Sequence, residues 1–197
     1  MKNKNQIHKI MARRKGIATT AQIEAAGVGR VQLKRFVAGG RIHRERHGVY
    51  VSPGFVEDEM TRLQSKYPRG IFSLGTALWL HKITDRTPVK FTLTFPRGYH
   101  AASLQNENVN RVFANKNVWG AGIVNVKNSY GETVRAYDME RTVCEVMRKR
   151  NSLGIELVTD AVRQYAARRD KNLHKLMQYA ELFRVTKPLR AYLEVLT

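Results

Sequence analysis

Asp138 and Glu140 come closest in this sequence to the paired carboxylates of a metal-dependent enzyme. In metal-dependent nucleases, two carboxylates hold a divalent cation that promotes hydrolysis of a phosphodiester, commonly with a lysine nearby. Residues at i and i+2 do not share a helix face, whereas an Asp before a helix and a Glu in its first turn stabilise the helix start. The predicted strands ending at Val89-Lys90 and Val126-Lys127 also lack an acidic residue two positions before the lysine. We therefore expect a helix cap at Asp138, and a DNA-binding nuclease is the least favoured interpretation.

Two histidines and the single cysteine are the next candidates for metal binding or catalysis. His43 and His47 have the i, i+4 spacing of a ligand pair, but the only cysteine is about 100 residues away and no carboxylate pattern accompanies them. Cys144 falls in the apolar register of its predicted helix with Val143 and Val146, which is typical of a core thiol. We expect no metal, no cofactor and no enzymatic activity.

A larger set of residues has the chemistry to read DNA. Arg and Gln side chains bind guanine and adenine edges, and a valine can contact the thymine methyl group in the major groove. On one face of a predicted helix and at the tip of a predicted hairpin, the sequence places Arg30, Val31, Gln32, Lys34, Arg35, Arg44, Arg46 and His47. A solvent-exposed helix with one stray valine is the alternative interpretation for the helix residues.

The charge distribution favours a polyanionic partner for the first quarter of the chain. The formal net charge is +19 and the pI is about 10.5. Residues 1–56 hold 12 lysines and arginines against Glu24 and Glu45, a net of +10, and the other 141 residues hold 23 basic and 14 acidic side chains, a net of +9. Such a local excess usually marks a surface that faces phosphates. A basic face that only aids solubility is the alternative.

A membrane surface is not supported as the partner. The longest apolar stretch, near residues 72–80, is interrupted by Ser73, Gly75 and Thr76 and is far shorter than the roughly 18 apolar residues of a spanning helix. No apolar run of the signal-peptide kind follows the basic start, and a single cysteine fits a reducing compartment. We expect a cytoplasmic protein.

Three helices and a hairpin must position the DNA-reading residues. Ile7, Ile10 and Met11 give a buried stripe to a helix over 5–14, and Thr19 or Thr20 can cap a second helix that ends before Gly27. A third helix runs from 29 to 38, with Val28 as a hydrophobic staple and with Leu33, Phe36 and Val37 facing the core. Residues 41–51 form a two-stranded wing with a turn at His47-Gly48. This order predicts a winged helix-turn-helix domain over residues 1–55.

The remainder predicts an α+β domain. A linker helix is expected within 56–69, and the domain over 70–197 is expected to combine a small sheet with a C-terminal helical bundle. Ser73 is predicted to cap a helix over 74–82. The predicted strands are 91–95, 109–113, 121–126 and 133–137, residues 98–108 are predicted as a loop, and the predicted helices are 139–150, 155–168, 172–183 and 187–195.

Four segments, taken in order, resemble one known family. They are RHGVY at 46–50, FSLGTALWLH at 72–81, DMERTVCE at 138–145 and YLEVL at 192–196. Together they resemble the AbiEi-type antitoxin and transcriptional regulator of bacterial type IV toxin-antitoxin (abortive infection) systems. The resemblance implies an N-terminal winged domain that represses its own operon by binding inverted repeats in its promoter. It also implies a C-terminal domain that counters a nucleotidyltransferase-like toxin without forming a stable complex.

Basic residues on the predicted C-terminal helices are the candidates for the antitoxin activity. They are Arg148, Lys149, Arg150, Arg168 and Arg169, and they could contact RNA, the substrate of the toxin, or solvent alone. A plain transcriptional regulator with a partner-sensing or ligand-sensing C-terminal domain is the competing hypothesis.

Overall fold

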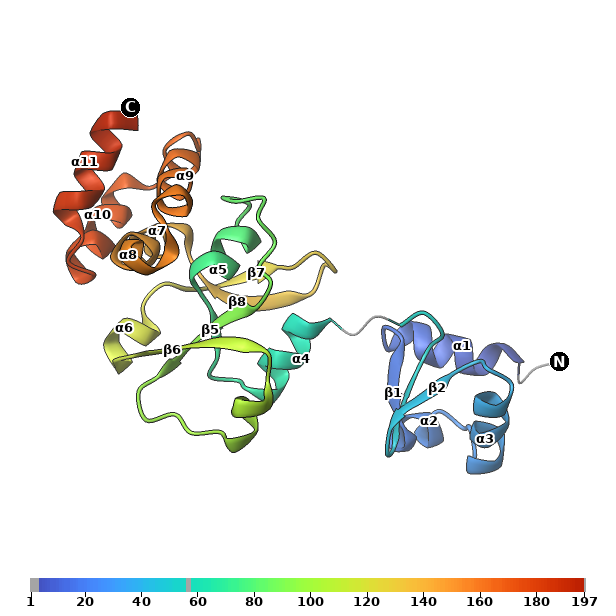
Figure 1. Cartoon of the computed structure of the whole chain (residues 1–197). Helices are drawn as coiled ribbons and strands as arrows, with labels where there is room; N and C mark the ends of the chain where they lie inside the picture. Colours follow the sequence, from blue (N-terminus) through green and yellow to red (C-terminus); the bar gives the residue numbers. More distant parts are fainter. Residues whose placement is uncertain (1–3, 56–57, 197) are drawn as a thin grey trace. The chain divides into compact units, whose positions relative to one another are not determined.

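The computed structural model describes residues 4–55 and 58–196. The chain divides into two compact units, residues Met1–Glu57 (unit 1) and Asp58–Thr197 (unit 2), each with its own core (Figure 1). The predicted boundary between residues 55 and 56 adjoins residues 56 and 57, which lie outside the described part of the chain. Within the described residues, no helix is long and apolar enough to cross a membrane. The predicted α+β fold class is confirmed.

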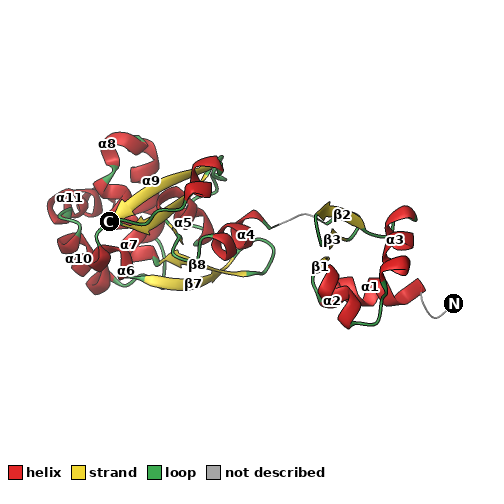
Figure 2. Cartoon of the chain, turned by 90° about the horizontal axis from the view of Figure 1, so that it is seen from below, coloured by secondary structure: helices red, strands yellow, loops and turns green. Residues whose placement is uncertain are grey.

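Unit 1 contains three helices packed against a small sheet (Figure 2). Its elements are α1 (Lys4–Arg13), β1 (Ile17–Thr19), α2 (Thr20–Ala25), α3 (Arg30–Ala38), β2 (His43–Arg46) and β3 (Val49–Val51). The strands are antiparallel in the order β1-β3-β2. Helices and hairpin therefore follow the predicted winged helix-turn-helix order, and the wing gains a third strand, β1, that the sequence analysis did not predict.

Apolar periodicity and capping explain the helices of unit 1. Ile7, Ile23, Val28 and Leu33 are buried in one cluster, which includes the predicted staple between Val28 and α3. Thr19, one of the two predicted caps, forms a capping box: its side chain accepts from the Gln22 backbone N–H at 3.3 Å, and the Gln22 side chain accepts from the Thr19 N–H at 3.0 Å. The start of α2 is thereby fixed at the end of β1.

Unit 2 contains a five-stranded mixed sheet and most of the helices. The strands are β4 (Ile71–Phe72), β5 (Phe91–Pro96), β6 (Val109–Ala114), β7 (Ile123–Lys127) and β8 (Thr133–Tyr137), in the spatial order β6-β5-β4-β8-β7. The helices are α4 (Glu59–Lys66), α5 (Leu74–Leu80), α6 (Lys116–Gly120), α7 (Met139–Arg148), α8 (Arg150–Leu153), α9 (Ile155–Ala166), α10 (Leu173–Leu182) and α11 (Thr186–Leu196), with a 3₁₀ turn at Ala102–Asn106.

The helix expected as a linker belongs instead to the core of unit 2. In α4, Met60 and Leu63 are buried, and the Gln64 side chain exchanges two hydrogen bonds with the backbone of Arg135 in β8, at 2.6 and 2.7 Å. Arg62 and Lys66 pair with Glu107 at 2.9 and 2.8 Å. Unit 2 therefore begins before residue 70, because α4 covers the sheet rather than bridging two domains.

Local differences from the sequence analysis occur where pairing is non-local. The two-residue strand β4 lies between β5 and β8, and it pairs with β8 in parallel at Phe72 and Ala136. Part of the loop expected over 98–108 forms the 3₁₀ turn, and the helix expected over 139–150 divides at Lys149 into α7 and α8. Ser73 stands at the N-cap of α5 but makes no capping bond, because its hydroxyl accepts from Thr94 at 2.8 Å.

Helix α7 is the centre of unit 2. Every residue from Glu140 to Met147 is buried, and Asp138 caps the helix by accepting from the Arg141 backbone N–H at 2.8 Å, which confirms the predicted cap. Cys144 is a core thiol, as predicted, and burial raises its pKa to about 12. At that pKa the thiol is neutral near pH 7, as expected of a side chain that packs in the core.

Candidate nucleic-acid interface

Helix α3 turns a basic face to solvent because its apolar positions are used by the core. Leu33 and Phe36 are buried. Val31 is 67% exposed, and the predicted reading residues Arg30, Lys34 and Arg35 are exposed with it, while Gln32 is half-buried. An apolar side chain left this open among cations is suited to contact with a thymine methyl group, with the charges placed for phosphates or guanine edges.

An ion pair holds Arg30 against the preceding helix. Arg30 Nε donates to Glu24 Oε1 at 2.8 Å, and the hydrogen bond to Glu24 raises the pKa of Arg30. Glu24 lies in α2, so the pair joins the two helices of the helix-turn-helix at the surface. Arg30 thus has an ion-pair partner on the neighbouring helix, which the sequence analysis did not predict.

The wing displays its cations on exposed backbone. All four residues of β2 are exposed, and the β2–β3 register shifts between Arg44 and Arg46, so that Glu45 forms a bulge. The turn at His47-Gly48 is confirmed: Gly48 has a φ of +73°, which favours glycine. Arg44 Nη2 donates to His47 Nδ1 at 2.8 Å, so these two predicted residues support each other at the tip.

The wing is also tied to the start of α2. The backbone N–H and the hydroxyl of Thr20 both donate to the Gly48 carbonyl, at 2.8 and 3.3 Å. Because α2 is capped one residue earlier, these bonds fix the hairpin turn relative to the helix-turn-helix. The eight predicted DNA-binding residues therefore all lie in one small unit, seven of them exposed and Gln32 half-buried.

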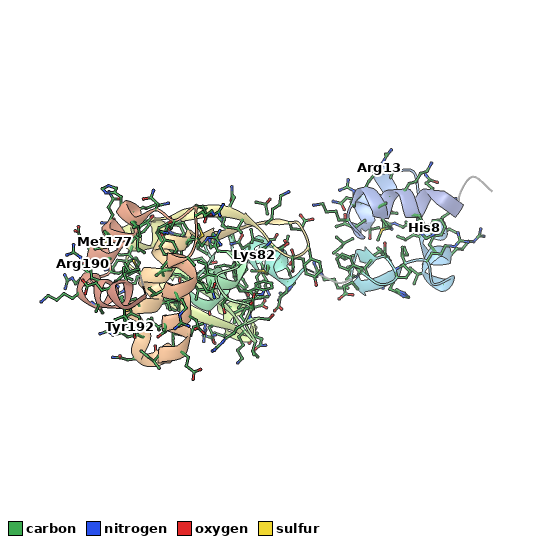
Figure 3. All side chains as sticks on the ribbon, turned by 90° about the horizontal axis from the view of Figure 1, so that it is seen from above. His8, Arg13, Lys82, Met177, Arg190 and Tyr192 are labelled. Carbon is green, nitrogen blue, oxygen red and sulfur yellow. The ribbon has the colours of Figure 1, made fainter. Side chains whose placement is uncertain are left out.

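Further cations of unit 1 line a groove that the sequence analysis missed. Its volume is about 820 Å³, and its walls include Arg13, Arg14 and Lys15 at the end of α1, together with Arg46 of the wing. Figure 3 shows Arg13 on α1. The basic run at 13–15 was the available signal, but its proximity to the wing depends on β1, which the sequence did not reveal.

No metal site accompanies the two wing histidines in the part of the chain that the structure describes. Over residues 4–55 and 58–196, no three His, Cys, Asp or Glu side chains group closely enough to hold an ion. His43 lies in β2 and is exposed. His47 accepts from Arg44 through Nδ1, which leaves Nε2 as a donor that can face a phosphate.

The candidate residues of unit 2 divide into two kinds. Arg148 and Lys149 are exposed at the C-terminal end of α7, and Arg169 is exposed after α9. Arg150 is half-buried and donates to the Met147 carbonyl at 3.3 Å. Arg168 donates to the Asp170 carboxylate at 2.8 Å and to the His81 carbonyl at 3.3 Å. Arg150 and Arg168 form hydrogen bonds within unit 2. The candidates that remain exposed to solvent are Arg148, Lys149 and Arg169.

Comparisons with known proteins agree with this organisation. Residues 5–53 match the sequence model of a family described as transcriptional regulator, AbiEi antitoxin, which confirms the predicted family resemblance over that segment. The fold is similar to the crystal structure of the RV2827C protein from Mycobacterium tuberculosis, with a TM-score of 0.56 and 16% sequence identity over 96% of this chain and 80% of that chain. At this identity the likeness concerns the fold alone. A search of curated proteins finds no match.

Proposed function

We propose that this chain, whose residues 5–53 match the AbiEi antitoxin regulators, binds double-stranded DNA at inverted repeats in its own promoter and represses its operon. The observation that carries the proposal is the exposed face of α3, where Val31, Lys34 and Arg35 lie together above a packed core. In this proposal the face of α3 enters the major groove, and the wing residues contact the phosphate backbone.

The test of DNA binding is a mobility-shift titration with the DNA upstream of the protein's own gene. The full chain is expected to bind this DNA more tightly than an unrelated duplex, and the variant carrying both Lys34→Ala and Arg35→Ala is expected to lose the preference. Equal affinity of the wild-type chain for both duplexes would contradict the proposed repressor function.

The second part of the proposal assigns antitoxin activity to unit 2. Its support is the likeness of the ordered sequence segments at 72–81, 138–145 and 192–196 to AbiEi-type antitoxins, all of which lie beyond the matched residues 5–53. The partner in this proposal is a nucleotidyltransferase-like toxin encoded next to the chain, and no stable complex is required. Neutralisation would take place in the cytoplasm and without catalysis by this chain.

Co-expression separates antitoxin activity from repression. The full chain and its Lys34→Ala/Arg35→Ala variant are each expressed with the neighbouring toxin gene under a promoter that the chain does not control. Both are expected to restore growth, because the substituted residues lie in unit 1. Failure of both to restore growth, with both proteins present at normal levels, would favour the competing function: a plain regulator whose unit 2 senses a partner or ligand.

A further inference from the structure

Unit 2 contains a pocket that the proposed DNA-binding surface does not use. Its volume is about 300 Å³, and its lining residues include ones from the C-terminal end of α7, the edge strand β6 and the start of α5. Figure 1 labels these elements. The charged and exposed aromatic side chains of its lining are Arg97, Phe113, Glu145, Arg148 and Lys149. Three of these five side chains are cationic, and Glu145 is the only acid in the lining.

The cations reach the pocket from two separate elements. Arg97 follows β5, and its backbone N–H donates to the Ala114 carbonyl at the end of β6 at 2.8 Å. Arg148 ends α7, and Lys149 caps it by donating its backbone N–H to the Glu145 carbonyl at 3.0 Å. All three side chains are exposed. The dipole of α7 by itself favours cations at its C-terminus, but Arg97 comes from a different element and faces the same pocket.

Glu145 lines the pocket but is committed to contacts within unit 2. The residue is 7% exposed, and its Oε1 accepts from Arg141 Nη2 at 3.0 Å. Its Oε2 has almost no accessible surface, so a ligand in the pocket does not reach it. Burial raises the pKa of Glu145, while Arg141 and the backbone amide of Leu74 favour the charged carboxylate. Glu145 therefore holds Arg141 in the core and leaves ligand contacts to the exposed side chains of the lining.

The pocket also has an aromatic wall. Phe113 is 49% exposed on the edge strand β6, with its ring 6.2 Å from that of Phe95 between centroids. Phe183 lines the pocket as well, and the Arg148 guanidinium lies 5.9 Å from the centroid of its ring. An exposed aromatic ring beside arginines offers both stacking and cation–π contacts to a planar ligand.

From these features we infer that the pocket binds a nucleotide. Its phosphate group would lie among Arg97, Arg148 and Lys149, and its base would contact Phe113. A volume of about 300 Å³ lies at the lower end of the range for small-molecule sites, which suits a single nucleotide. This site is independent of DNA binding by unit 1, because all its residues belong to unit 2.

Calorimetric titration of the full chain with the four ribonucleoside 5′-monophosphates and the four triphosphates tests the inference. At least one is expected to bind, and Arg97→Ala or Arg148→Ala is expected to weaken its binding tenfold or more, with Phe113→Ala also weakening it. The matched control is Arg190→Ala, which removes the same charge from the exposed side of α11 (Figure 3) and should change the affinity less than twofold.

Three results would overturn the inference. They are no binding of any of the eight nucleotides, wild-type affinity in both the Arg97→Ala and the Arg148→Ala variant, and displacement of the nucleotide by inorganic phosphate at equal concentration. Phe113→Leu removes the aromatic ring but keeps an apolar side chain, and it should weaken nucleotide binding while leaving phosphate binding unchanged. Urea unfolding of each variant establishes that the compared proteins are folded.

A free nucleotide and the end of an RNA chain present the same chemistry to this pocket. Competition between a fluorescent nucleotide and a short RNA oligonucleotide separates the two sources. If RNA displaces the fluorescent nucleotide at a lower concentration than the mononucleotide does, and if the Arg148→Ala variant loses this displacement, the ligand of the site is an RNA end. Displacement by the mononucleotide alone would support the site with a free nucleotide as its ligand. Displacement by RNA that Arg148→Ala leaves unchanged would contradict the inference.

Discussion

Arg35 of unit 1 and Arg141 of unit 2 are both arginines, but one is exposed and the other is buried, and this difference determines what each can bind. Arg35 is exposed on α3, beside Lys34 and Val31. Arg141 is fully buried in α7, with its guanidinium 3.1 Å from the centroid of the Tyr137 ring and hydrogen bonds to Glu145 and to the carbonyls of Val118 and Ala121. A displayed cation is available to an external phosphate, whereas a buried one is committed to the fold.

Net charge alone does not identify the nucleic-acid-binding surface of this chain. Units 1 and 2 contribute similar excess charge, but part of the charge in unit 2 neutralises buried or half-buried carboxylates. Lys175 pairs with the buried Asp138 at 3.0 Å, and Arg62 and Lys66 surround Glu107. The functional surface must therefore be sought among side chains that are exposed and lack such internal partners.

The largest expected effect comes from removing the buried cation. Arg141→Met should destabilise unit 2 by about 3–5 kcal/mol, because it leaves Glu145 and several backbone carbonyls without their donor in the core. Both tryptophans, Trp79 and Trp119, lie in unit 2, so urea unfolding followed by tryptophan fluorescence reports on this unit. Arg148→Ala, about two helical turns away and exposed, is the control, with an expected change within about 0.5 kcal/mol. Equal stability of the two variants would refute the structural role of Arg141.

The displayed cation should behave in the opposite way. Arg35→Ala should cost about 1–3 kcal/mol of DNA-binding free energy and should leave the free energy of unfolding almost unchanged. If Arg35 reads a base edge, the preference at one base pair should relax, as measured by competition with single-base variants of the promoter DNA. Uniform weakening on every sequence would instead identify Arg35 as a phosphate contact. Arg190→Ala in unit 2 controls for the loss of one positive charge.

The ion cluster around Glu107 should make unit 2 sensitive to acid. Hydrogen bonds from Arg62 and Lys66 lower the pKa of Glu107 from 4.5 to about 2. Because the folded-state pKa is depressed, the stabilisation is complete above pH 4.5 and is lost as the pH falls from there towards 2. Because solvent screens the exposed Lys66, this contribution of Glu107 to the free energy of unfolding is limited to about 1–2 kcal/mol.

Urea unfolding of the wild-type chain and of Glu107→Gln at several pH values measures this contribution. The variant should be less stable than the wild type at pH 7, and the difference should shrink below pH 4.5. A difference that stays constant from pH 7 to pH 3 would mean that Glu107 stabilises the fold by packing rather than by its charge.

The smallest expected effect concerns the ion pair between α2 and α3. Glu24→Gln removes the carboxylate that holds Arg30 at 2.8 Å and lowers the negative charge beside the proposed DNA surface. DNA affinity should rise by about twofold to fivefold, as one more cation becomes available to phosphates. The same substitution at Glu181 in unit 2 should have no effect. A loss of affinity in Glu24→Gln would show that the ion pair orients Arg30 for DNA contact.

Sequence reasoning succeeded where structure depends on neighbours along the chain. The helices of unit 1 follow from apolar spacing, the Thr19 cap and glycine breaks, and Asp138 was recognisable as a cap from the residues beside it. It missed β1 and β4, because strands of three and two residues form only through pairing with distant partners. The linker role expected for α4 was inferred from its place in the sequence, but Gln64 joins it to β8.

The candidate sites show the same division. The exposed face of α3 could be predicted from a helical wheel, because the core positions of a single helix determine which residues remain outside. The Arg30–Glu24 pair and the pocket around Glu145 could not be predicted, since each combines residues from separate elements. Arg168 was indistinguishable in sequence from Arg169, and only the hydrogen bonds to His81 and Asp170 separate a structural arginine from a displayed one.

The salt dependence of DNA binding shows whether unit 1 binds DNA through its exposed cations. The affinity of the full chain for its promoter DNA is measured between about 50 and 200 mM salt. If about six phosphates are neutralised, the logarithm of the affinity should fall against the logarithm of salt concentration with a slope of roughly −5. A slope near zero would contradict the account, because binding would then not depend on contacts between cations and phosphates.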